Sequence, residues 1–464
     1  IEQQHCTGNH LGCHLWFTRG TQPVDRPRGA AAEHLAEMIR IRTVSFADKA
    51  QEDPEPFEEF PRLLARLYPN VHSACKCERP GPRSLLFRWP GKAPGDPTVL
   101  MAHYDVVPAD EDAWEKPPFA GIIEGGVLWG RGTLDTKGTL LGVMEAAEAM
   151  IARGFVPEHD IYLAFAGDEE IAGTGAPTTV KLLKARGIHA AHVVDEGGAV
   201  VENVFPGVSR PCALVGIGEK GSVNFEFSLA SKGGHASAPP AHTLVGRLAR
   251  AVTRVEGKPF PARMTKATAE LFDTLGRHST FVYRMIFANL WCFLPLLDLI
   301  CKKRGGELNA LMRTTCAFTM MEGSRAANVL PPKARMVANL RLISGDTASS
   351  AAEALRAVIQ DDSIAVQRLN GDDPSPFSRT DSEGWRRLRR AIRATWPEAL
   401  VSPYLMIAGS DSRHFSAISE NVMRFCPMAL STEERGYIHG HNERIPVEKL
   451  GTLVEFYLRL IAQC

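Results

Sequence analysis

Apolar and polar positions in the first half of the chain follow two periods that alternate along the sequence. Short, nearly continuous apolar runs predict buried strands over residues 84–89, 99–105, 160–166 and 191–194. Between them, apolar residues three or four positions apart predict helices over residues 30–41, 58–67, 139–153 and 176–186. Strands that alternate with helices favour an α/β fold, in which helices cover both faces of a mostly parallel sheet.

The pattern changes in the middle of the chain. Residues 222–230 and 335–342 alternate strictly between apolar and polar positions, which is typical of strands with one exposed face. A helix is predicted between them, and we interpret this block as an inserted α+β lid. Beyond it, helices are predicted over residues 351–359, 384–396 and 447–461, and a strand over residues 422–426. The chain is therefore divided into a poorly ordered extension (1–29), a catalytic domain in two parts (30–220 and 346–464) and a lid (221–345).

Residues 281–301 form an apolar run that is long enough to span a bilayer. Arg284, Asn289, Pro295 and Asp298 interrupt the run, and a charged side chain inside a bilayer is costly. We therefore expect a buried helical pair, an oligomer contact or the wall of an apolar ligand site here, and no transmembrane span.

Composition narrows the classes of partner. Lys and Arg together number 53, as do Asp and Glu, and this balance argues against nucleic acid or an anionic membrane as the main partner. The ten cysteines include no C-x-x-C pair, so free thiols are the simplest interpretation, with one or two disulfides left open. Residues 1–28 contain no hydrophobic core of a signal peptide, which favours a cytoplasmic location unless the N-terminus is processed.

The stretch MAHYDVVP places a histidine and an aspartate at the end of a predicted strand. Residues two apart on a strand share a face, so His103 and Asp105 point the same way. A metal-binding imidazole usually donates its other N–H to a carboxylate, which fixes its tautomer and orientation. The H-x-D motif supplies this pair within one element.

Four further motifs carry acidic and histidine residues. Asp135 precedes a helix in GRGTLDTKG, Glu169 and Glu170 follow a strand in AGDEEIAG, Asp195 follows another strand in VVDEGG, and His439 lies in HGHNE. The carboxyl ends of parallel strands meet at one edge of a sheet, so these side chains can converge. Zinc takes His nitrogen and carboxylate oxygen ligands, and two ions roughly 3.5 to 4 Å apart need a bridging carboxylate.

Each of these motifs is weak when it is considered alone. A lone H-x-D is as often a structural hydrogen-bonded pair, and a lone pair of glutamates is usually solvated. Asp135 alone would most often cap a helix, and VVDEGG alone would most often be a turn at the end of a strand. Their joint occurrence in this order is what indicates a two-metal hydrolase.

The whole set of motifs resembles a known family. H-x-D, G-R-G-x-x-D-x-K-G, D-E-E, V-D-E-G-G, G-G-H-x-S-x-P and H-G-x-N-E resemble those of the co-catalytic zinc family of aminoacylases, carnosinases, carboxypeptidase S and succinyl-diaminopimelate desuccinylases. The likeness is greatest to the secreted N-fatty-acyl amino acid synthase/hydrolase branch. It covers residues 30–463 and implies a zinc exopeptidase-like α/β domain with a ferredoxin-like lid.

The resemblance implies a role for each motif residue. His103 and Asp195 would bind one Zn²⁺, Glu170 and His439 would bind the other, and Asp135 would bridge the two ions. Glu169 would be the general base, and Asp105 would orient His103. In HGHNE, His441 stands where the branch usually has a small apolar residue, so His441 competes with His439 as the ligand.

The family likeness also implies roles for residues around the lid. His235 in GGHASAPP would polarise the scissile carbonyl, often in the active site of a partner subunit, although a loop histidine bonded to backbone is the plain alternative. Asn328 and Arg341 match substrate-contacting positions, and a guanidinium suits a carboxylate. From its pattern alone, Arg341 is merely an outward residue of a strand. The loop GSDSR (409–413) matches an active-site loop or is a plain turn.

One apparent motif is rejected. Gly216, Gly218 and Gly221 satisfy G-x-G-x-x-G, but a dinucleotide site needs a helix next, and a strand pattern follows. We interpret these glycines as the hinge into the lid.

The sequence predicts a two-zinc amidohydrolase that cleaves, or also forms, the amide bond of N-acyl amino acids. Residues 281–301 could wall a pocket for a long acyl chain. A dipeptidase or carboxypeptidase of the same family is the nearest alternative, and a non-catalytic binder of acyl amino acids is an alternative of another class. The expected partners are a small substrate and a second copy through the lid.

Overall fold

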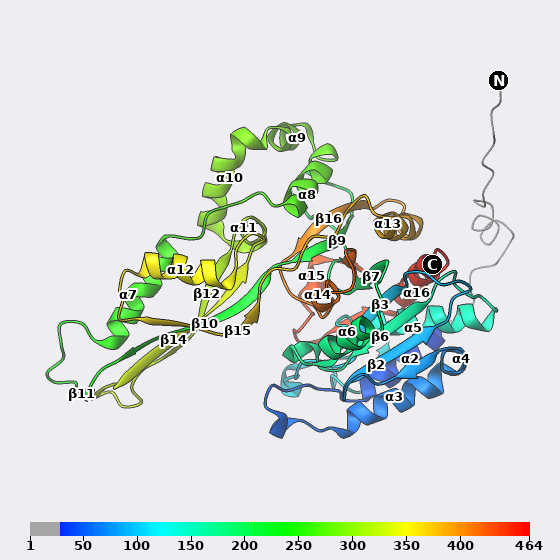
Figure 1. Ribbon diagram of the computed structural model, residues 1–464, viewed down its shortest axis with the longest axis horizontal. Coiled ribbons are helices and arrows are strands. Elements are labelled where there is room, and N and C mark those ends of the chain that lie inside the picture. Colours follow the sequence, from blue (N-terminus) through cyan, green and yellow to red (C-terminus); the bar gives the residue numbers. More distant parts are fainter. Residues whose placement is uncertain (1–27, 206) are drawn as a thin grey trace.

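The computed structural model describes residues 28–205 and 207–464. The predicted extension lies outside this part of the chain, except for residues 28 and 29, which open a helix. The described residues form two lobes, each built around its own sheet (Figure 1). The described cysteines are all free thiols.

The larger lobe contains a mixed sheet, which has ten strands within the described residues. Its order is β1-β2-β6-β3-β7-β17-β9-β8-β18, and β16 also pairs with β9. The neighbours β6, β3, β7 and β17 run parallel, so the predicted α/β fold with a mostly parallel central sheet is confirmed. The strands are β1 (Lys76–Glu78), β2 (Ser84–Trp89), β3 (Thr98–His103), β6 (Ile161–Ala166), β7 (His192–Asp195), β8 (Val200–Val201), β9 (Cys212–Glu219), β16 (Leu400–Met406), β17 (Val422–Arg424) and β18 (Ala429–Leu430).

Helices cover both faces of this sheet, as the alternating pattern predicted. Alternate residues of β3 enter different cores: Leu100 and Ala102 join the core under one helical layer, and Val99 and Met101 join the core under the other. Every position of β3 is therefore buried, which explains its continuous apolar sequence. The first layer holds α2 (Arg28–Arg40), α3 (Glu55–Leu67), α4 (Pro69–Ala74), α5 (Lys137–Ala152), α13 (Glu383–Thr395) and α16 (Val447–Ile461), and the second holds α6 (Gly175–Ala185) and α14 (Ser412–Phe415).

Short elements connect these layers. A small antiparallel sheet, β19-β5-β4, ties the segment before α5 to the C-terminal region. The short elements are η1 (Lys49–Gln51), η2 (Glu111–Ala113), β4 (Ile122–Glu124), β5 (Val127–Trp129), η3 (Glu169–Ile171), α15 (Thr432–Arg435) and β19 (Arg444–Pro446).

The smaller lobe is an antiparallel sheet of order β12-β14-β10-β15, covered on one face by α7 (Leu244–Gly257) and α12 (Ala348–Ile359). Its strands are β10 (Gly221–Ala230), β12 (Thr315–Glu322), β14 (Lys333–Leu342) and β15 (Ala365–Asp372). The predicted domain boundary at residue 345 falls inside this lobe, because α12 and β15 lie beyond it. The sequence of β15 is mostly exposed and lacks an apolar alternation, so it gave no strand signal.

Four helices follow α7 beside the larger lobe: α8 (Lys266–Arg277), α9 (Phe281–Ala288), α10 (Leu290–Arg304) and α11 (Gly306–Met312). The apolar run 281–301 thus forms two helices, and of the three alternatives expected for it the structure contradicts only the buried helical pair. No residue of α9 is buried, and Cys301 alone is buried in α10. Within the described residues no single helix could cross a membrane; only α9 and α10 taken together have the length and composition, and they are bent by 104°.

The three glycines of the rejected dinucleotide motif lie in strands. Gly216 and Gly218 belong to β9, and Gly221 begins β10. A strand and not a helix follows them, so the rejection of a dinucleotide site is supported. Because β9 lies in the larger sheet and β10 in the smaller one, the chain passes between lobes at Lys220.

Candidate metal centre

The carboxyl ends of three neighbouring strands bring together residues from distant parts of the sequence. His103 is the last residue of β3, Glu169 and Glu170 lie in η3 just after β6, and Asp195 ends β7. Since β6, β3 and β7 are adjacent and parallel, these ends meet at one edge of the sheet. The strand pattern therefore positions this edge as the sequence predicted.

Asp135 lies between two histidines. Its Oδ1 is 3.1 Å from His103 Nε2, and its Oδ2 is 3.1 Å from His439 Nε2. His439 Nε2 is also 3.1 Å from Glu170 Oε2. One carboxylate thus faces two imidazoles with separate oxygens, which is the arrangement that a bridging ligand needs.

Glu196 completes the group on the His103 side. Its Oε1 lies 3.3 Å from His103 Nε2. The neighbouring Asp195, which the resemblance implied as the ligand, accepts a hydrogen bond of 3.0 Å from the Ser412 N–H at its Oδ2. The structure therefore brings Glu196 to the cluster where the sequence interpretation expected Asp195.

Asp105 fixes both His103 and the glutamate pair. Its carbonyl oxygen and Oδ1 lie 3.0 and 3.3 Å from His103 Nδ1, on the ring edge away from Asp135. The backbone N–H groups of Glu169 and Glu170 donate to its two carboxylate oxygens, at 3.2 and 3.1 Å. The role predicted for Asp105, to orient His103, agrees with these contacts.

Glu443, the last residue of HGHNE, holds the Asp135 loop in place. It is fully buried, and its Oε1 accepts hydrogen bonds from the N–H groups of Gly132, Leu134 and Asp135. Its Oε2 pairs with Arg131 at 2.8 Å. The C-terminal motif thus supplies a histidine to the cluster and also the carboxylate that holds the loop of Asp135.

The two histidines of HGHNE differ in position. His439 has a positive φ of 59° and reaches Asp135 and Glu170, and its side chain is half exposed on the solvent side of the cluster. His441 is exposed, and among the described contacts none joins it to these carboxylates. The geometry favours His439 over His441.

Burial and mutual repulsion act on the carboxylates of the cluster. Burial raises the pKa of Glu169 well above its ordinary value, and the charges of Glu196 and Asp411 add to this against the opposing effect of His103. Burial likewise raises the pKa of Glu196, with the charge of Asp135 as the next cause. Ionising these groups together is therefore unfavourable without added positive charge.

The histidines respond in the opposite direction. Hydrogen bonds to Asp135 and Glu170 raise the pKa of His439 to about 10. Burial lowers the pKa of His103, but the carboxylates of Glu196, Asp105 and Asp135 outweigh it and raise the pKa well above its ordinary value. Protons on these rings thus supply positive charge that a divalent cation could supply instead.

The donor set fits divalent cations of the zinc type. Two ligand atoms on one tetrahedral zinc ion lie roughly 3.3 Å apart, since each sits about 2.0–2.1 Å from the metal. The contacts of 3.1 to 3.3 Å around His103 and His439 have this spacing. In addition, Glu170 Oε1 is buried and has no hydrogen-bond partner among the described residues. Glu169 Oε2 lies farther from His103 Nε2, at 3.9 Å, and His103, Glu169 and Glu196 form a second group whose ligand atoms lie within 4.8 Å of one another.

Comparison with known proteins agrees with this chemistry. The family model described as peptidase family M20/M25/M40 matches residues 99–463, a span that contains every member of the cluster. The chain belongs to this family. As an M20 family member it is a metal-dependent hydrolase of amide bonds.

Similar proteins cover nearly the whole chain. Probable carboxypeptidase S-like 2 of Dictyostelium discoideum is 36% identical over 438 residues, which are 93% of this chain and 84% of the relative. N-fatty-acyl-amino acid synthase/hydrolase PM20D1 of Xenopus tropicalis is 36% identical over 447 residues, 95% of this chain and 87% of the relative. The structure of the M20 family metallo-carboxypeptidase Sso-CP2 from Sulfolobus solfataricus has a TM-score of 0.70 at 17% identity, covers 93% of this chain and 98% of that one, and shows the fold alone.

Two of the predicted lid residues lie away from this M20 centre. His235 is exposed in β11 (Gly234–His235), which pairs with β13 (Val329–Leu330), and Asn328 precedes β13. The His235 ring accepts or donates a 2.8 Å hydrogen bond with Ser237, and the Asn328 carbonyl accepts one from the Ala236 N–H. Figure 1 shows β11 at the far tip of the smaller lobe, so one chain does not bring these residues to its own centre.

Arg341 and the GSDSR loop lie nearer to the metal centre of this M20 enzyme. In the loop, Ser412 donates to Asp195, and Arg413 pairs with the buried Glu219 at 2.9 Å. Arg341, in β14, is half buried, and burial and the nearby charge of Arg413 lower its pKa. The loop therefore adjoins the site as expected, and Arg341 belongs to a basic group at the passage between lobes.

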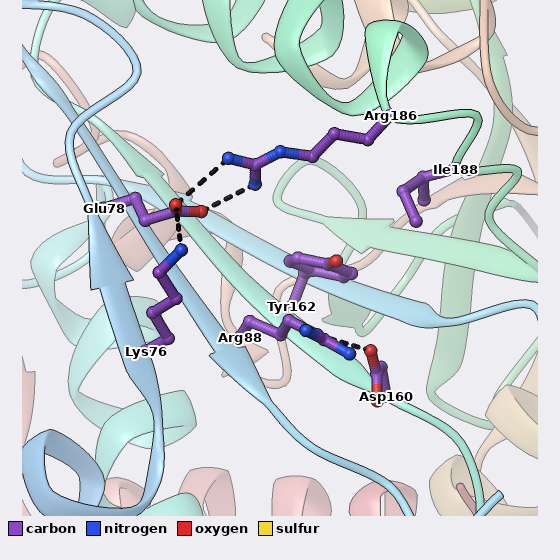
Figure 2. A pocket seen from close by; sticks show the side chains of 7 residues that line it. All are labelled: Lys76, Glu78, Arg88, Asp160, Tyr162, Arg186 and Ile188. Carbon is purple, nitrogen blue, oxygen red and sulfur yellow. Dashed lines mark hydrogen bonds and ion pairs between the residues drawn. The ribbon is translucent and has the colours of Figure 1, made fainter. Parts of the chain in front are cut away.

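A separate surface depression does not belong to the centre. Figure 2 shows it lined by charged side chains that point toward one another from β1, β2, β6 and the end of α6. Glu78 pairs with Arg186 and Lys76, and Arg88 pairs with Asp160. Because these charges satisfy each other, we assign no chemistry to this depression.

The residues that sequence reasoning missed are Glu196, Asp411, Glu219 and Glu443. Glu196 follows Asp195 as Glu170 follows Glu169, so the same argument from adjacent acids could have found it. Glu443 stood in a quoted motif, but nothing in its spacing showed that it would accept backbone hydrogen bonds from a loop more than 300 residues away in sequence.

Proposed function

We propose that this M20 enzyme hydrolyses the amide bond of N-acyl amino acids at two Zn²⁺ ions. The observation that carries the proposal is the placement of Asp135 between His103 and His439, each 3.1 Å from one of its oxygens. In this arrangement Asp135 can bridge two ions, one bound with His103 and the other with His439. Glu169 is then not needed as a ligand.

The residues fall into three groups by role. His103 and Glu196 would hold one ion, His439 and Glu170 the other, and Asp135 both. When bound, two such ions would acidify water and polarise a carbonyl oxygen. Because Asp105 engages Nδ1, it would keep His103 in the tautomer whose Nε2 is free to bind an ion.

Glu169 is the general base in this proposal. Its Oε2 lies 3.9 Å from His103 Nε2, and burial raises the pKa of its carboxyl group, so it can accept a proton from water and pass it on. The acceptor of that proton is the nitrogen of the leaving amino acid, which must depart as a neutral amine. Asp105, through the Glu169 backbone N–H, holds this carboxylate at the edge of the site.

The substrate class rests on the relatives. One is named as a hydrolase and synthase of N-fatty-acyl amino acids and another as carboxypeptidase S-like, so both names fit an amide whose amine is an amino acid. A peptidase that acts on dipeptides or peptide C-termini is therefore the second candidate. A non-catalytic binder is disfavoured because the base and the proposed ligands are all retained.

We also propose that the active unit is a homodimer. His235 and Asn328 sit side by side at the tip of the smaller lobe, joined through the Ala236 N–H, and are remote from their own chain's centre. A donor for the developing oxyanion must lie at the reacting carbonyl, so His235 can act only in the site of another copy. Arg341, beside the passage between lobes, would grip the substrate carboxylate.

The metal ligands can be tested by paired substitutions. Glu196→Gln is expected to weaken zinc binding by about 100-fold or more, because it removes a charged ligand. Asp195→Asn is expected to change it much less, since an amide oxygen can still accept from Ser412. Competition with a chromophoric chelator measures both affinities. If Asp195→Asn loses zinc and Glu196→Gln keeps it, the sequence-based assignment of Asp195 is the correct one.

The reaction can be tested with acetyl-, oleoyl- and dipeptide substrates that share one amino acid. We expect amide cleavage of the acyl amino acids, and Glu169→Gln should lower kcat about 10²- to 10⁴-fold with metal content unchanged. Preference for dipeptides would support the peptidase, and zinc binding with no turnover would support the binder. Equal rates on acetyl and oleoyl substrates would show that the enzyme has no preference for a long acyl chain.

Dimer function can be tested by mixing two inactive variants. In His235→Ala the base is intact, and in Glu169→Gln the lid histidine is intact. Random mixed dimers would carry one complete site in each heterodimer, so activity should recover to about a quarter of wild type. Mixtures that stay inactive, although subunits exchange as judged by differently tagged copies, would contradict a site shared between subunits.

A further inference from the structure

The helices α9 and α10 present a concentrated apolar surface. Seven of the fifteen large apolar side chains that are exposed in the described chain lie here. The Trp291 and Phe281 side chains are 82% and 73% exposed, which is far beyond the exposure of a core residue. The exposed set, called the α9–α10 surface below, comprises Phe281, Val282, Met285, Trp291, Leu296, Leu299 and Ile300. Exposed apolar side chains concentrated in this way are typical of binding sites.

The two helices that carry the α9–α10 surface are anchored to the rest of the molecule. Phe287 of α9 packs against Phe205 and Phe272, with ring centroids 4.9 and 5.5 Å apart. Asp298 of α10 pairs with Arg313, a fully buried arginine that also donates to the Phe260 carbonyl. Figure 1 shows both helices at the outer edge of the molecule. The apolar side chains are thus displayed by packed helices at the periphery.

Positive charge adjoins the α9–α10 surface. Residues 281–304 contain four basic residues and one acidic residue, Asp298, which is already paired. Lys302, Lys303 and Arg304 end α10, and within the described chain neither Lys303 nor Arg304 has an ion-pair partner. The zero net charge of the whole chain argued against an anionic membrane as the main partner. Locally, however, the excess of basic residues at the end of α10 would attract an anionic surface. Charge and apolar area therefore coincide in one place.

The geometry indicates that the two helices insert into the membrane–water interface and do not cross the bilayer. The two helices are apolar enough together to pass as a span, but they meet at 104° around Asn289, and neither is long enough alone. Exposed aromatic and aliphatic side chains can enter the acyl boundary of a bilayer while Lys302, Lys303 and Arg304, at the end of α10, stay among its anionic headgroups. Trp291 is the kind of side chain that is enriched at that depth.

We propose that the α9–α10 surface docks this enzyme on the surface of a phospholipid bilayer that carries anionic headgroups. The apolar side chains of both helices enter the acyl boundary, and Lys302, Lys303 and Arg304 lie against the headgroups. The binding does not depend on which amide the enzyme cleaves.

Two other occupants fit less well. A second copy that docked symmetrically on the same surface would bring the two basic ends into one interface, and lysine is depleted at such interfaces. An acyl chain bound as a substrate needs side chains that converge on a recess, but Trp291 and Phe281 point outward with most of their area exposed. A bilayer accepts both the convex apolar surface and the charge.

The test is flotation of the full chain with unilamellar vesicles. We expect binding to vesicles of phosphatidylcholine with about a third phosphatidylserine, and binding about tenfold weaker when the phosphatidylserine is left out or salt is raised. The triple variant Phe281→Ser, Trp291→Ser, Leu296→Ser should bind at least about tenfold more weakly. The variant Lys302→Gln, Lys303→Gln, Arg304→Gln should lose the dependence on phosphatidylserine.

A matched control distinguishes binding through the α9–α10 surface from nonspecific binding through other exposed apolar side chains. Ile123→Ser, Val156→Ser, Leu369→Ser removes three exposed apolar side chains elsewhere and should bind as wild type does. Circular dichroism and thermal unfolding check that all variants fold. The proposal is overturned if wild type does not float with the vesicles, or if the control variant loses binding as much as the α9–α10 variant does. It is also overturned if the α9–α10 variant binds vesicles as wild type does and light scattering shows only that it is a monomer where wild type is a dimer.

Discussion

The structure depends on placing several carboxylates out of bulk water within a few ångströms of one another. Asp135, Glu170 and Glu196 surround two histidines at the edge of the larger sheet, with Glu169 beside them. Burial and repulsion make their joint ionisation unfavourable, and only added positive charge can offset this. Bound cations would stabilise such a site. Because it needs added positive charge and offers nitrogen and oxygen ligands, it favours divalent cations that accept both.

The rest of the larger lobe serves to hold this cluster in register. Parallel strands deliver His103 and the glutamates to one edge because their carboxyl ends are adjacent. The loop of Asp135 does not lie in a strand. Its backbone N–H groups instead donate hydrogen bonds to Glu443, which lies near the C-terminus. A single buried carboxylate from near the C-terminus therefore fixes the position of Asp135, which lies between the two histidines.

Much of this was predictable from the sequence, and the exceptions have physical causes. His103, Asp135, Glu169 and Glu170 stand at the ends of apolar strands or at the start of a helix, where pattern alone shows direction. Which of Asp195 and Glu196 faces His103 depends on how the backbone turns after β7. Glu196 Oε1 lies 3.3 Å from His103 Nε2, whereas Asp195 Oδ2 accepts a hydrogen bond from Ser412, more than 200 residues away in sequence.

Exposure was harder to predict than secondary structure. The run 281–301 has the composition of a buried segment, and its helices form as expected, but a 104° bend leaves most of its apolar side chains outside the core. Likewise β15 carries no apolar alternation because most of its residues face solvent, so the smaller lobe extends beyond its predicted end. Local pattern determines which segments are helical, whereas burial depends on which other surfaces are available.

The most direct test of the central claim is anomalous X-ray scattering at the zinc absorption edge from crystals grown with zinc. The account predicts two peaks beside the Asp135 carboxylate, one next to His103 and Glu196 and one next to His439 and Glu170, with Glu169 a ligand of neither. A single peak, or peaks that leave Asp135 without a metal on either side, would contradict it.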